Sequence, residues 1–179
     1  ESLNRTINSA FFSATRLISL QTRNSAAYKG IMALVYREQC RDFVKGTTMD
    51  IVKSMDESPD IHHIFPESYC AKQGYKREQW NSIINKTPLL PESNRSIGGS
   101  APSVYSKNVL KTAEIDEQTY KERVESHLIK YDYFIKDDFK AYFVDRAKAL
   151  LAVIENAMKK TIADKSSEQT VQLYGQSLE

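Results

Sequence analysis

The chain has 179 residues, with 25 Lys and Arg against 23 Asp and Glu, and 41% of its residues are hydrophobic. This composition excludes a disordered chain, because such chains contain fewer apolar residues and carry a larger charge imbalance. The six glycines and five prolines argue against a collagen-like chain and against a turn-rich β-sandwich. The near-neutral net charge of +2 argues, at first sight, against a nucleic-acid partner, since such domains usually carry a basic excess.

The N-terminal segment, 1–58, is predicted to be helical. Apolar residues recur at helical spacing from Ile7 to Ile18, and a second helix is expected over about 25–43, with Gly46 as a stop just beyond it. A short turn or helix is expected over 47–55. Because the chain begins with Glu1 and not with Met, we interpret it as a piece of a longer protein.

Several features favour a reduced, cytoplasmic protein. The longest strictly apolar run, 31–36, is far shorter than the roughly 20 residues of a membrane-spanning helix. No basic-then-apolar leader of the signal-peptide type is apparent. Cys40 and Cys70 are too few for a disulfide scaffold, although a single bridge between them stays open.

At about Pro59 the sequence pattern changes from helical apolar spacing to short strand-like segments. Residues 60–66 are β-branched and aromatic, which predicts a short strand. A second short strand is expected over 86–90, where a proline at position 88 confines it to an edge or a bulge. Residues 91–97 predict a short helix, with a proline in its first turn and a glycine after its end. The segment 59–112 therefore reads strand, loop, strand, short helix.

Helices return after residue 102. One is expected from about Asp116, with apolar residues on one face, and a longer one is expected after Asp137 or Asp138 as its cap. The inward positions of these two helices are expected to be Tyr120, Val124, Leu128, Phe139, Tyr142, Phe143, Leu150, Ile154, Ala157 and Met158. The C-terminal helices, 113–163, are expected to pack on the core, and 164–179 is expected to be a polar tail that is loose at its end. The predicted fold class is α+β and mostly α-helical, with a small ββα unit inserted between two helical segments.

Two of the three histidines, His62 and His63, are adjacent near the end of the first predicted strand. Asn85 and Asn94 follow nine positions apart, and Asn94 falls in the first turn of the predicted short helix. His127 is interpreted as a packing residue, which is the usual role of a solitary histidine. The adjacent pair before a proline is unusual for packing alone, and it therefore marks the candidate functional site.

The order of these residues resembles the HNH nucleases, which have the ββα-metal fold. The strings 81–89, 93–95, 97–99 and 101–103 are similar to one HNH branch, and the stretches 126–128, 137–139 and 146–158 are similar to its helical end. That branch forms the C-terminal nuclease half of bacterial restriction and phage-defence proteins with a ParB-like N-terminal nucleotidase module. The resemblance implies that such a regulatory domain belongs to the same protein.

The resemblance implies a metal-dependent endonuclease that hydrolyses DNA phosphodiester bonds by nicking, in restriction or anti-phage defence. A neutral imidazole is a suitable base for the attacking water, and this role is assigned to His63. His62 and the side-chain oxygen of Asn94 are expected to bind the divalent metal ion. Asn85 is expected to hydrogen-bond the loop between the strands and to hold His63 in place. Asp60 is expected to accept a hydrogen bond from an imidazole N–H.

The expected metal follows from a departure from the family pattern. Many HNH sites have an acidic residue where this chain has His62, and several have a further histidine where this chain has Gly98. Imidazole ligands favour Mn²⁺, Ni²⁺ or Zn²⁺, whereas Mg²⁺ prefers a shell made of oxygen. We therefore expect Mn²⁺ or Ni²⁺ to support activity at least as well as Mg²⁺.

Regular strand alternation would send the side chains of His62 and His63 to opposite faces. In the HNH arrangement both side chains flank the same phosphate. The strand is therefore expected to end or to twist at this pair.

Other interpretations stay open at this point. The histidine pair could be incidental, or it could form a structural zinc site with Cys70, although a fourth ligand is missing. The chain could be a catalytically silent HNH-like module that binds DNA or a partner, or an RNase that uses the same site. A homo-oligomer also stays open, since two assembled copies are needed to cut both strands.

Charge is unevenly distributed along the chain. Residues 1–60 hold 8 basic and 7 acidic residues, 61–112 hold 7 and 3, and 113–179 hold 10 and 13, which gives net charges of +1, +4 and −3. The basic middle contains the candidate site, and a local contact with DNA is therefore compatible with the small overall charge. The expected phosphate contacts are Lys72, Lys76, Arg77, Lys86 and Arg95. The acidic C-terminal helices are expected to face away from the DNA.

Overall fold

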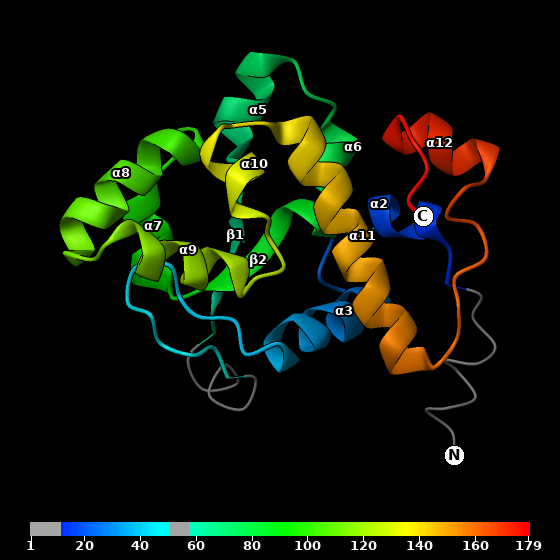
Figure 1. Cartoon of the computed structure of the whole chain (residues 1–179), viewed down its shortest axis with the longest axis horizontal. Coiled ribbons are helices and arrows are strands. Elements are labelled where there is room, and N and C mark those ends of the chain that lie inside the picture. The colour runs from blue at the N-terminus through cyan, green and yellow to red at the C-terminus, as the bar shows by residue number, and fades with distance from the viewer. Residues whose placement is uncertain (1–11, 51–57) are drawn as a thin grey trace.

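The computed structural model describes residues 12–50 and 58–179 (Figure 1). In chain order its elements are α2 (Ala14–Ser19), α3 (Ala26–Arg37), β1 (Asp60–His63), α5 (Glu67–Gln73), α6 (Arg77–Trp80), the 3₁₀ turn η1 (Ile83–Asn85), β2 (Lys86–Leu89), α7 (Pro91–Ile97), α8 (Pro102–Ala113), α9 (Glu117–Glu125), α10 (Tyr131–Ile135), α11 (Phe139–Met158) and α12 (Glu168–Tyr174). The helical spacing expected at residues 7–11 and most of the segment expected at 47–55 lie outside the described residues.

The expected α+β class is confirmed at the level of a mostly helical chain with a small antiparallel sheet. β1 pairs with β2, so that His62 lies opposite Thr87 and His63 lies opposite Lys86. In a two-stranded sheet each strand is an edge, and Pro88 is accommodated there as expected. The predicted short helix is α7, which begins with Pro91 and ends before Gly98 at φ +72°.

The second helix is shorter than expected, because α3 ends at Arg37 and not near residue 43. Gln39 has a positive φ of 57°, and the chain then folds back through a bridge between Arg41 and Thr48. Gly46, with φ +72°, occupies the turn, and a Cβ atom there would lie 2.7 Å from the guanidinium of Arg123. The apolar spacing beyond Arg37 therefore belongs to a packed turn and not to a helix.

The loop expected between the strands contains α5, α6 and η1, and the segment after the ββα unit begins with α8. α10 was also not predicted. These elements are short or polar: α6 has four residues, α10 has five, and α5 buries Cys70 alone. Apolar periodicity has too few positions to reveal such helices, which owe their stability to tertiary packing.

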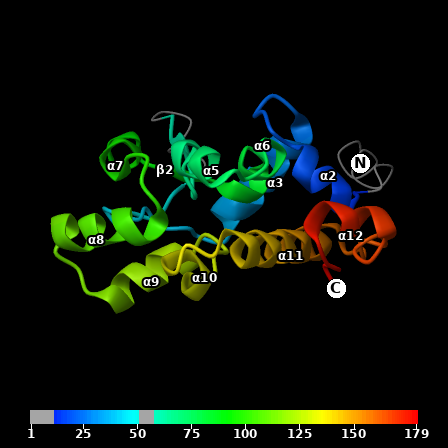
Figure 2. The same cartoon turned by 90° about the horizontal axis from the view of Figure 1, so that it is seen from above.

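The C-terminal helices α8–α11 lie on one side of the molecule, and α5, α6, α7 and the sheet lie on the other (Figure 2). Asp138 caps α11 and Asp116 caps α9, as expected. One inward position was wrong, because Ala157 is exposed. Leu128 packs against the core as expected, but it lies beyond the end of α9 with φ 64°. Among the described helices, none is both long enough and apolar enough to cross a membrane.

The expected loose tail at 164–179 was also wrong, because it contains α12 and packs against α2. The Tyr174 hydroxyl donates a hydrogen bond of 2.8 Å to the Ala14 carbonyl, and Leu178 is buried. Asp164 accepts hydrogen bonds from the Ala14 backbone N–H and the Ser13 hydroxyl. These contacts join the two ends of the described chain.

Cys40 and Cys70 are both buried free thiols, so the disulfide bridge left open by the sequence is not formed. Burial raises the pKa of each thiol to about 12. A thiol with a raised pKa carries little thiolate and is unreactive, and we assign both cysteines to packing.

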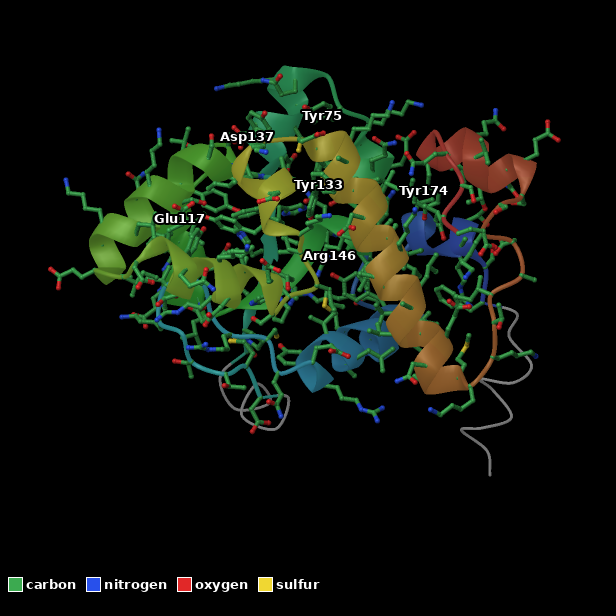
Figure 3. The ribbon with its side chains drawn as sticks, in the orientation of Figure 1. Tyr75, Glu117, Tyr133, Asp137, Arg146 and Tyr174 are labelled. Atoms are coloured by element: carbon green, nitrogen blue, oxygen red, sulfur yellow. The ribbon has the colours of Figure 1, made fainter. Side chains whose placement is uncertain are left out.

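Arg146 connects α11 to the turn before β2 (Figure 3). Its side chain is fully buried, and its guanidinium donates hydrogen bonds to the carbonyl oxygens of Ile83 (3.2 Å), Ile84 (2.6 Å), Lys86 (2.9 Å) and His127 (3.2 and 3.3 Å). Five bonds from one rigid, planar group therefore hold η1 and β2 against the C-terminal layer.

His127 is a packing residue, as predicted. Its Nε2–H donates to the Arg41 carbonyl at 2.7 Å, and its Nδ1 therefore accepts from the Thr87 hydroxyl at 2.5 Å. Burial is the largest cause that lowers the pKa of His127, to about 3, and the Arg146 cation lowers it further. The imidazole is therefore neutral in the folded protein at all but strongly acidic pH.

This burial predicts acid sensitivity. Below pH 6.5 the unfolded chain protonates residue 127, whereas the folded chain does not do so until about pH 3. The free energy of unfolding is therefore expected to fall as the pH falls through this window, by roughly 1.4 kcal/mol per pH unit from this residue. Urea unfolding from pH 7.5 to pH 4 measures this slope. His127→Gln removes the titrating group, so the slope of the unfolding free energy against pH is expected to decrease by the contribution of one proton. An unchanged slope in the variant contradicts the prediction.

Candidate catalytic site

The ββα unit brings together the side chains of His62 and Asn94, which are 32 positions apart in the sequence. His62 lies on β1 and Asn94 on α7, and His62 Nδ1 lies 2.9 Å from Asn94 Oδ1. β1 ends at His63, as expected from the requirement that both histidines reach one site. The two expected metal ligands are thus adjacent, one from the strand and one from the helix.

Asp60 orients the amide of Asn94. The Asn94 Nδ2 donates to Asp60 Oδ2 at 3.2 Å, so Oδ1 is the amide atom that faces His62. Asp60 was expected to accept from an imidazole, and this was wrong, because its partner is the amide. The position of Asp60 at the start of β1 places its carboxylate beside α7 and away from both rings.

His62 is 3% exposed and lies edge-on to the rings of Phe43 and Tyr105. Burial is the largest cause that lowers its pKa, to about 4, and the bond to Asn94 opposes that shift. Its Nε2 atom is buried and has no hydrogen-bond partner among the described residues. Because Asn94 Oδ1 only accepts, Nδ1 of the neutral ring carries the proton in this structure and donates it to Asn94. Binding of a metal through Nδ1 would require this proton to move to the unpartnered Nε2.

The residues at this position fit a divalent cation. An imidazole nitrogen and an amide oxygen are donors that first-row divalent metals accept. Nδ1 of His62 and Oδ1 of Asn94 are 2.9 Å apart, which is a hydrogen-bond distance, so the two donor atoms lie side by side. Within residues 12–50 and 58–179 there is no cluster of three or more His, Cys, Asp and Glu of metal-binding type, which argues against the zinc site with Cys70.

A cleft of about 590 Å³ opens over this pair, and we call it the first cleft. His62, His63 and Asn94 line it, together with Glu67 of α5 and the backbone around Gly98 and Gly99. The remaining coordination positions of a cation here would face this open space, as in a catalytic site and unlike a closed structural one. The first cleft is also large enough for a small substrate group.

His63 is half-buried and is oriented by a chain of two amides. The Asn81 Nδ2 donates to Gln21 Oε1 at 3.5 Å, so Asn81 Oδ1 faces His63 Nε2 at 3.3 Å. An amide oxygen only accepts, so Nε2 carries the proton and the lone pair lies on Nδ1. Burial lowers the pKa of His63, and the Lys86 cation lowers it further. The ring is therefore a neutral base at neutral pH.

Asn85 makes the loop contacts expected of it. Its Oδ1 accepts from the Phe65 backbone N–H at 2.9 Å, and its Nδ2 donates to the carbonyls of Phe65 and Trp80, each at 2.9 Å. The Tyr142 hydroxyl of α11 donates to the same Oδ1 at 3.1 Å. Asn85 is fully buried, and it ties the chain two residues after His63 to the turn before β2.

Asp42 holds α7 in place and was not predicted. Its carboxylate is fully buried and accepts from the Leu90 backbone N–H at 2.9 Å and from the Ser93 hydroxyl at 2.6 Å. It also accepts from the backbone N–H groups of Val44 and Lys45. The packed turn after α3 thus fixes the N-terminal end of the helix that carries Asn94.

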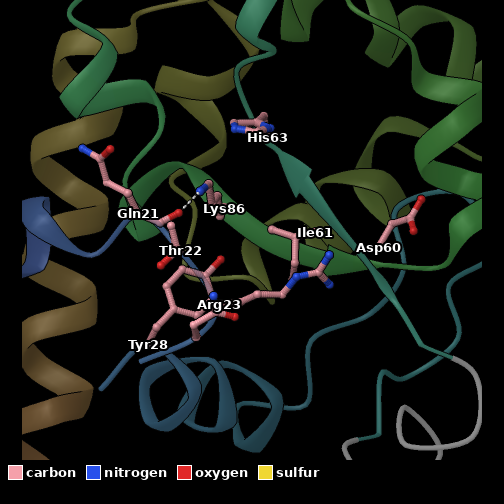
Figure 4. A pocket seen from close by; sticks show the side chains of 9 residues that line it. Gln21, Thr22, Arg23, Tyr28, Asp60, Ile61, His63 and Lys86 are labelled. Atoms are coloured by element: carbon pink, nitrogen blue, oxygen red, sulfur yellow. Dashed lines mark hydrogen bonds between the residues drawn. The ribbon is translucent and has the colours of Figure 1, made fainter. Parts of the chain in front are cut away.

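A second cleft, of about 480 Å³, is also lined by His63 (Figure 4). It is formed by the connection between α2 and α3, which includes Gln21 and Arg23, together with Tyr28, Asp60 and Lys86. His63 and Ile61 line both clefts. The N-terminal helical segment therefore contributes a wall of the site, although it lies outside the ββα unit.

The five basic residues expected to contact DNA occupy different environments. Lys86 is 6% exposed and lines the second cleft, so it is not a surface residue as expected. The other four are exposed and line neither of the two clefts: Lys72, Lys76, Arg77 and Arg95. They are placed on α5, at and in α6, and on α7.

Sequence reasoning missed Gln21, Arg23, Asp42, Glu67 and Asn81. Asn81 and Glu67 had a local signal, since Asn81 begins the string 81–89 that carries the resemblance and Glu67 directly follows the predicted strand 60–66. The others had none, because their distance from the histidines along the chain, 20 residues or more, leaves no spacing to interpret. Their place in the site is a product of tertiary packing.

The comparisons with known proteins add one relative. No family model matches the chain. The chain is 31% identical over 130 residues to Uncharacterized protein MJ0686 of Methanocaldococcus jannaschii, a match that covers 69% of this chain and 22% of that protein. The chain therefore spans less than a quarter of the relative it matches. The relative's name states no activity, so the similarity concerns sequence and not function.

Proposed function

We propose that this chain is a metal-dependent HNH endonuclease domain that hydrolyses DNA phosphodiester bonds by nicking, in restriction or anti-phage defence. One observation carries the proposal: His62 and Asn94 meet at 2.9 Å from a strand and a helix, with His63 beside them in one cleft. A base next to a pair of metal-type donors, open to a cleft, is the arrangement that phosphodiester hydrolysis needs. A longer protein with a nucleotidase module and a cytoplasmic location belong to the same proposal.

In the proposed reaction, His63 Nδ1 removes a proton from a water molecule in the cleft while the water oxygen bonds to phosphorus. The bond from phosphorus to the 3′ oxygen breaks and the 3′ oxygen takes a proton from solvent water, so that the products carry a 5′-phosphate and a 3′-hydroxyl. A divalent cation, when bound by His62 and Asn94, supplies the positive charge that stabilises the leaving oxygen. Asn81 keeps the proton of the neutral ring on Nε2, and Asn85 keeps the loop after His63 in position.

Removal of the metal donor on α7 tests this proposal. We expect the wild-type protein to nick supercoiled plasmid with Mn²⁺ or Ni²⁺ at least as fast as with Mg²⁺, and to stop when EDTA is added. Asn94→Ala removes Oδ1 and is expected to raise the Mn²⁺ concentration for half-maximal nicking by about 10–100-fold. Titration of Mn²⁺ against the initial nicking rate measures both effects.

Asn108→Ala is the matched control, because Asn108 is an exposed residue of α8, and it is expected to behave as wild type. Nicking in Mg²⁺ alone would count against His62 as a ligand. The absence of nicking with every metal would favour the silent binding module, and faster cleavage of RNA in a parallel assay would favour the RNase. Either result overturns the proposal.

A further inference from the structure

The second cleft contains a cation, Lys86, that forms no ion pair with the residues the structure describes. Lys86 is 6% exposed, and its Nζ donates one hydrogen bond, of 2.6 Å, to the Gln21 carbonyl (Figure 4). An ammonium group has three donors, so two remain for a ligand in the cleft. No ion pair of Lys86 occurs in the described parts of the chain, and the Nζ lies 5.9 Å from the centroid of the Tyr28 ring.

A buried ammonium without a carboxylate is costly, and its environment therefore favours an anion that neutralises it. Burial lowers the pKa of Lys86, and the nearby Arg77 cation lowers it further. Both effects would be relieved by a negative group in the cleft. Within the described residues this amine makes one hydrogen bond, to the backbone of the connection between α2 and α3, and one cation–π contact, with the Tyr28 ring.

Arg23 adds a second positive charge to the same cleft. It is exposed on the connection between α2 and α3, and it is in no ion pair with the residues that the structure describes. Among the described residues, Asp60 is the one carboxylate that lines the second cleft, and its Oδ2 accepts a hydrogen bond from the Asn94 amide. Two cations therefore face an open space of about 480 Å³ with one engaged carboxylate, a balance that favours an anionic ligand.

We propose that the second cleft binds a backbone phosphate of the DNA strand beside the one that is cut, with Arg23 and Lys86 as its contacts. The two clefts meet at Ile61 and His63, so a strand whose scissile phosphate lies in the first cleft passes directly into the second. This inference rests on the proposed function for the identity of the anion. It makes the N-terminal helical segment part of the substrate site.

DNA binding without hydrolysis tests this inference. The wild-type chain in EDTA is titrated into a labelled duplex oligonucleotide, and fluorescence anisotropy gives the dissociation constant from about 50 to 200 mM salt. Arg23→Ala is expected to weaken binding about three- to tenfold and to lower the slope of log K against log salt by about 1. Lys86→Met has a similar buried volume and is expected to have the same effect. If Lys86→Met does not fold, Arg23→Ala still tests the inference, because Arg23 is exposed.

Arg37→Ala is the matched control, because Arg37 is exposed at the other end of α3. Affinity and salt slope unchanged by Arg23→Ala would overturn the inference, as would Arg23-dependent binding of free deoxynucleoside monophosphate without binding of DNA. The two proposals can be refuted separately. If DNA binding depends on Arg23 but no nicking occurs, the phosphate site is supported and the nuclease proposal is refuted. If Arg23→Ala nicks DNA and binds it with wild-type affinity, the nuclease proposal is supported and the phosphate site is refuted.

Discussion

His63→Ala is expected to lower the rate of plasmid nicking by about 10²–10⁴-fold, which is the usual contribution of a positioned general base. The loss follows from the geometry, since His63 is the half-buried neutral imidazole that lines both clefts, and Asn81 orients its lone pair on Nδ1. His62 cannot replace it, because His62 is 3% exposed and its Nδ1 faces Asn94. Initial rates of conversion of supercoiled to nicked plasmid in Mn²⁺ measure the effect.

Two further measurements separate chemistry from misfolding. The far-UV circular dichroism and the melting temperature of His63→Ala are expected to stay close to wild type, because the ring is half-buried and has a single weak side-chain hydrogen bond. Imidazole added to the assay is expected to restore part of the activity of His63→Ala, since the missing group is a base of that chemistry. Nicking at the wild-type rate by this variant would remove His63 from the mechanism.

Arg146→Met is expected to destabilise the protein by about 3 kcal/mol. The substitution removes five hydrogen bonds from a charged donor, and such bonds contribute about 1.5–3 kcal/mol each in favourable cases. Relief of the cost of burying a cation without a carboxylate offsets a large part of that sum. The net effect is expected to be destabilising, because the carbonyl groups that lose their donor stay buried between α11 and β2. Urea unfolding followed by circular dichroism measures the loss.

Arg146→Lys is expected to recover less than half of this loss, because an ammonium cannot reach carbonyls on both η1 and the chain after α9. Arg37→Met is the control for a Met in place of Arg at an exposed position, and we expect it to change the free energy of unfolding by less than about 0.5 kcal/mol. An unfolding free energy of Arg146→Met equal to that of wild type would show that α11 does not hold the turn before β2.

The ββα unit illustrates what local sequence can predict. Pro91 starts α7 and Gly98 ends it, because a fixed φ suits the first turn of a helix and a positive φ suits its end. The strands were found from β-branched residues and their bounding prolines. The histidine pair and Asn94 were chosen from residue type and spacing, and the structure brings these three side chains into one cleft.

Other features depended on packing between distant segments. The expected helix over 25–43 stops at Arg37, and the turn that replaces its end carries Asp42, which bonds to the start of α7 some fifty positions further along the chain. The tail that was expected to be loose is a helix because Tyr174 and Leu178 find a surface on the N-terminal segment. Neither contact could be predicted from the local spacing or composition of the sequence.

By itself, the sequence determined the class of fold, the place of the strands and of α7, and the residue types of the candidate site. Tertiary structure alone decided that Asp60 orients an amide and not an imidazole, that Lys86 is a buried cation, and that Gln21 and Arg23 belong to the site. The physical reason is the distance along the chain over which each kind of interaction acts. Turn, cap and strand preferences act within a few residues, whereas hydrogen bonds and burial depend on which surfaces meet once the chain has packed.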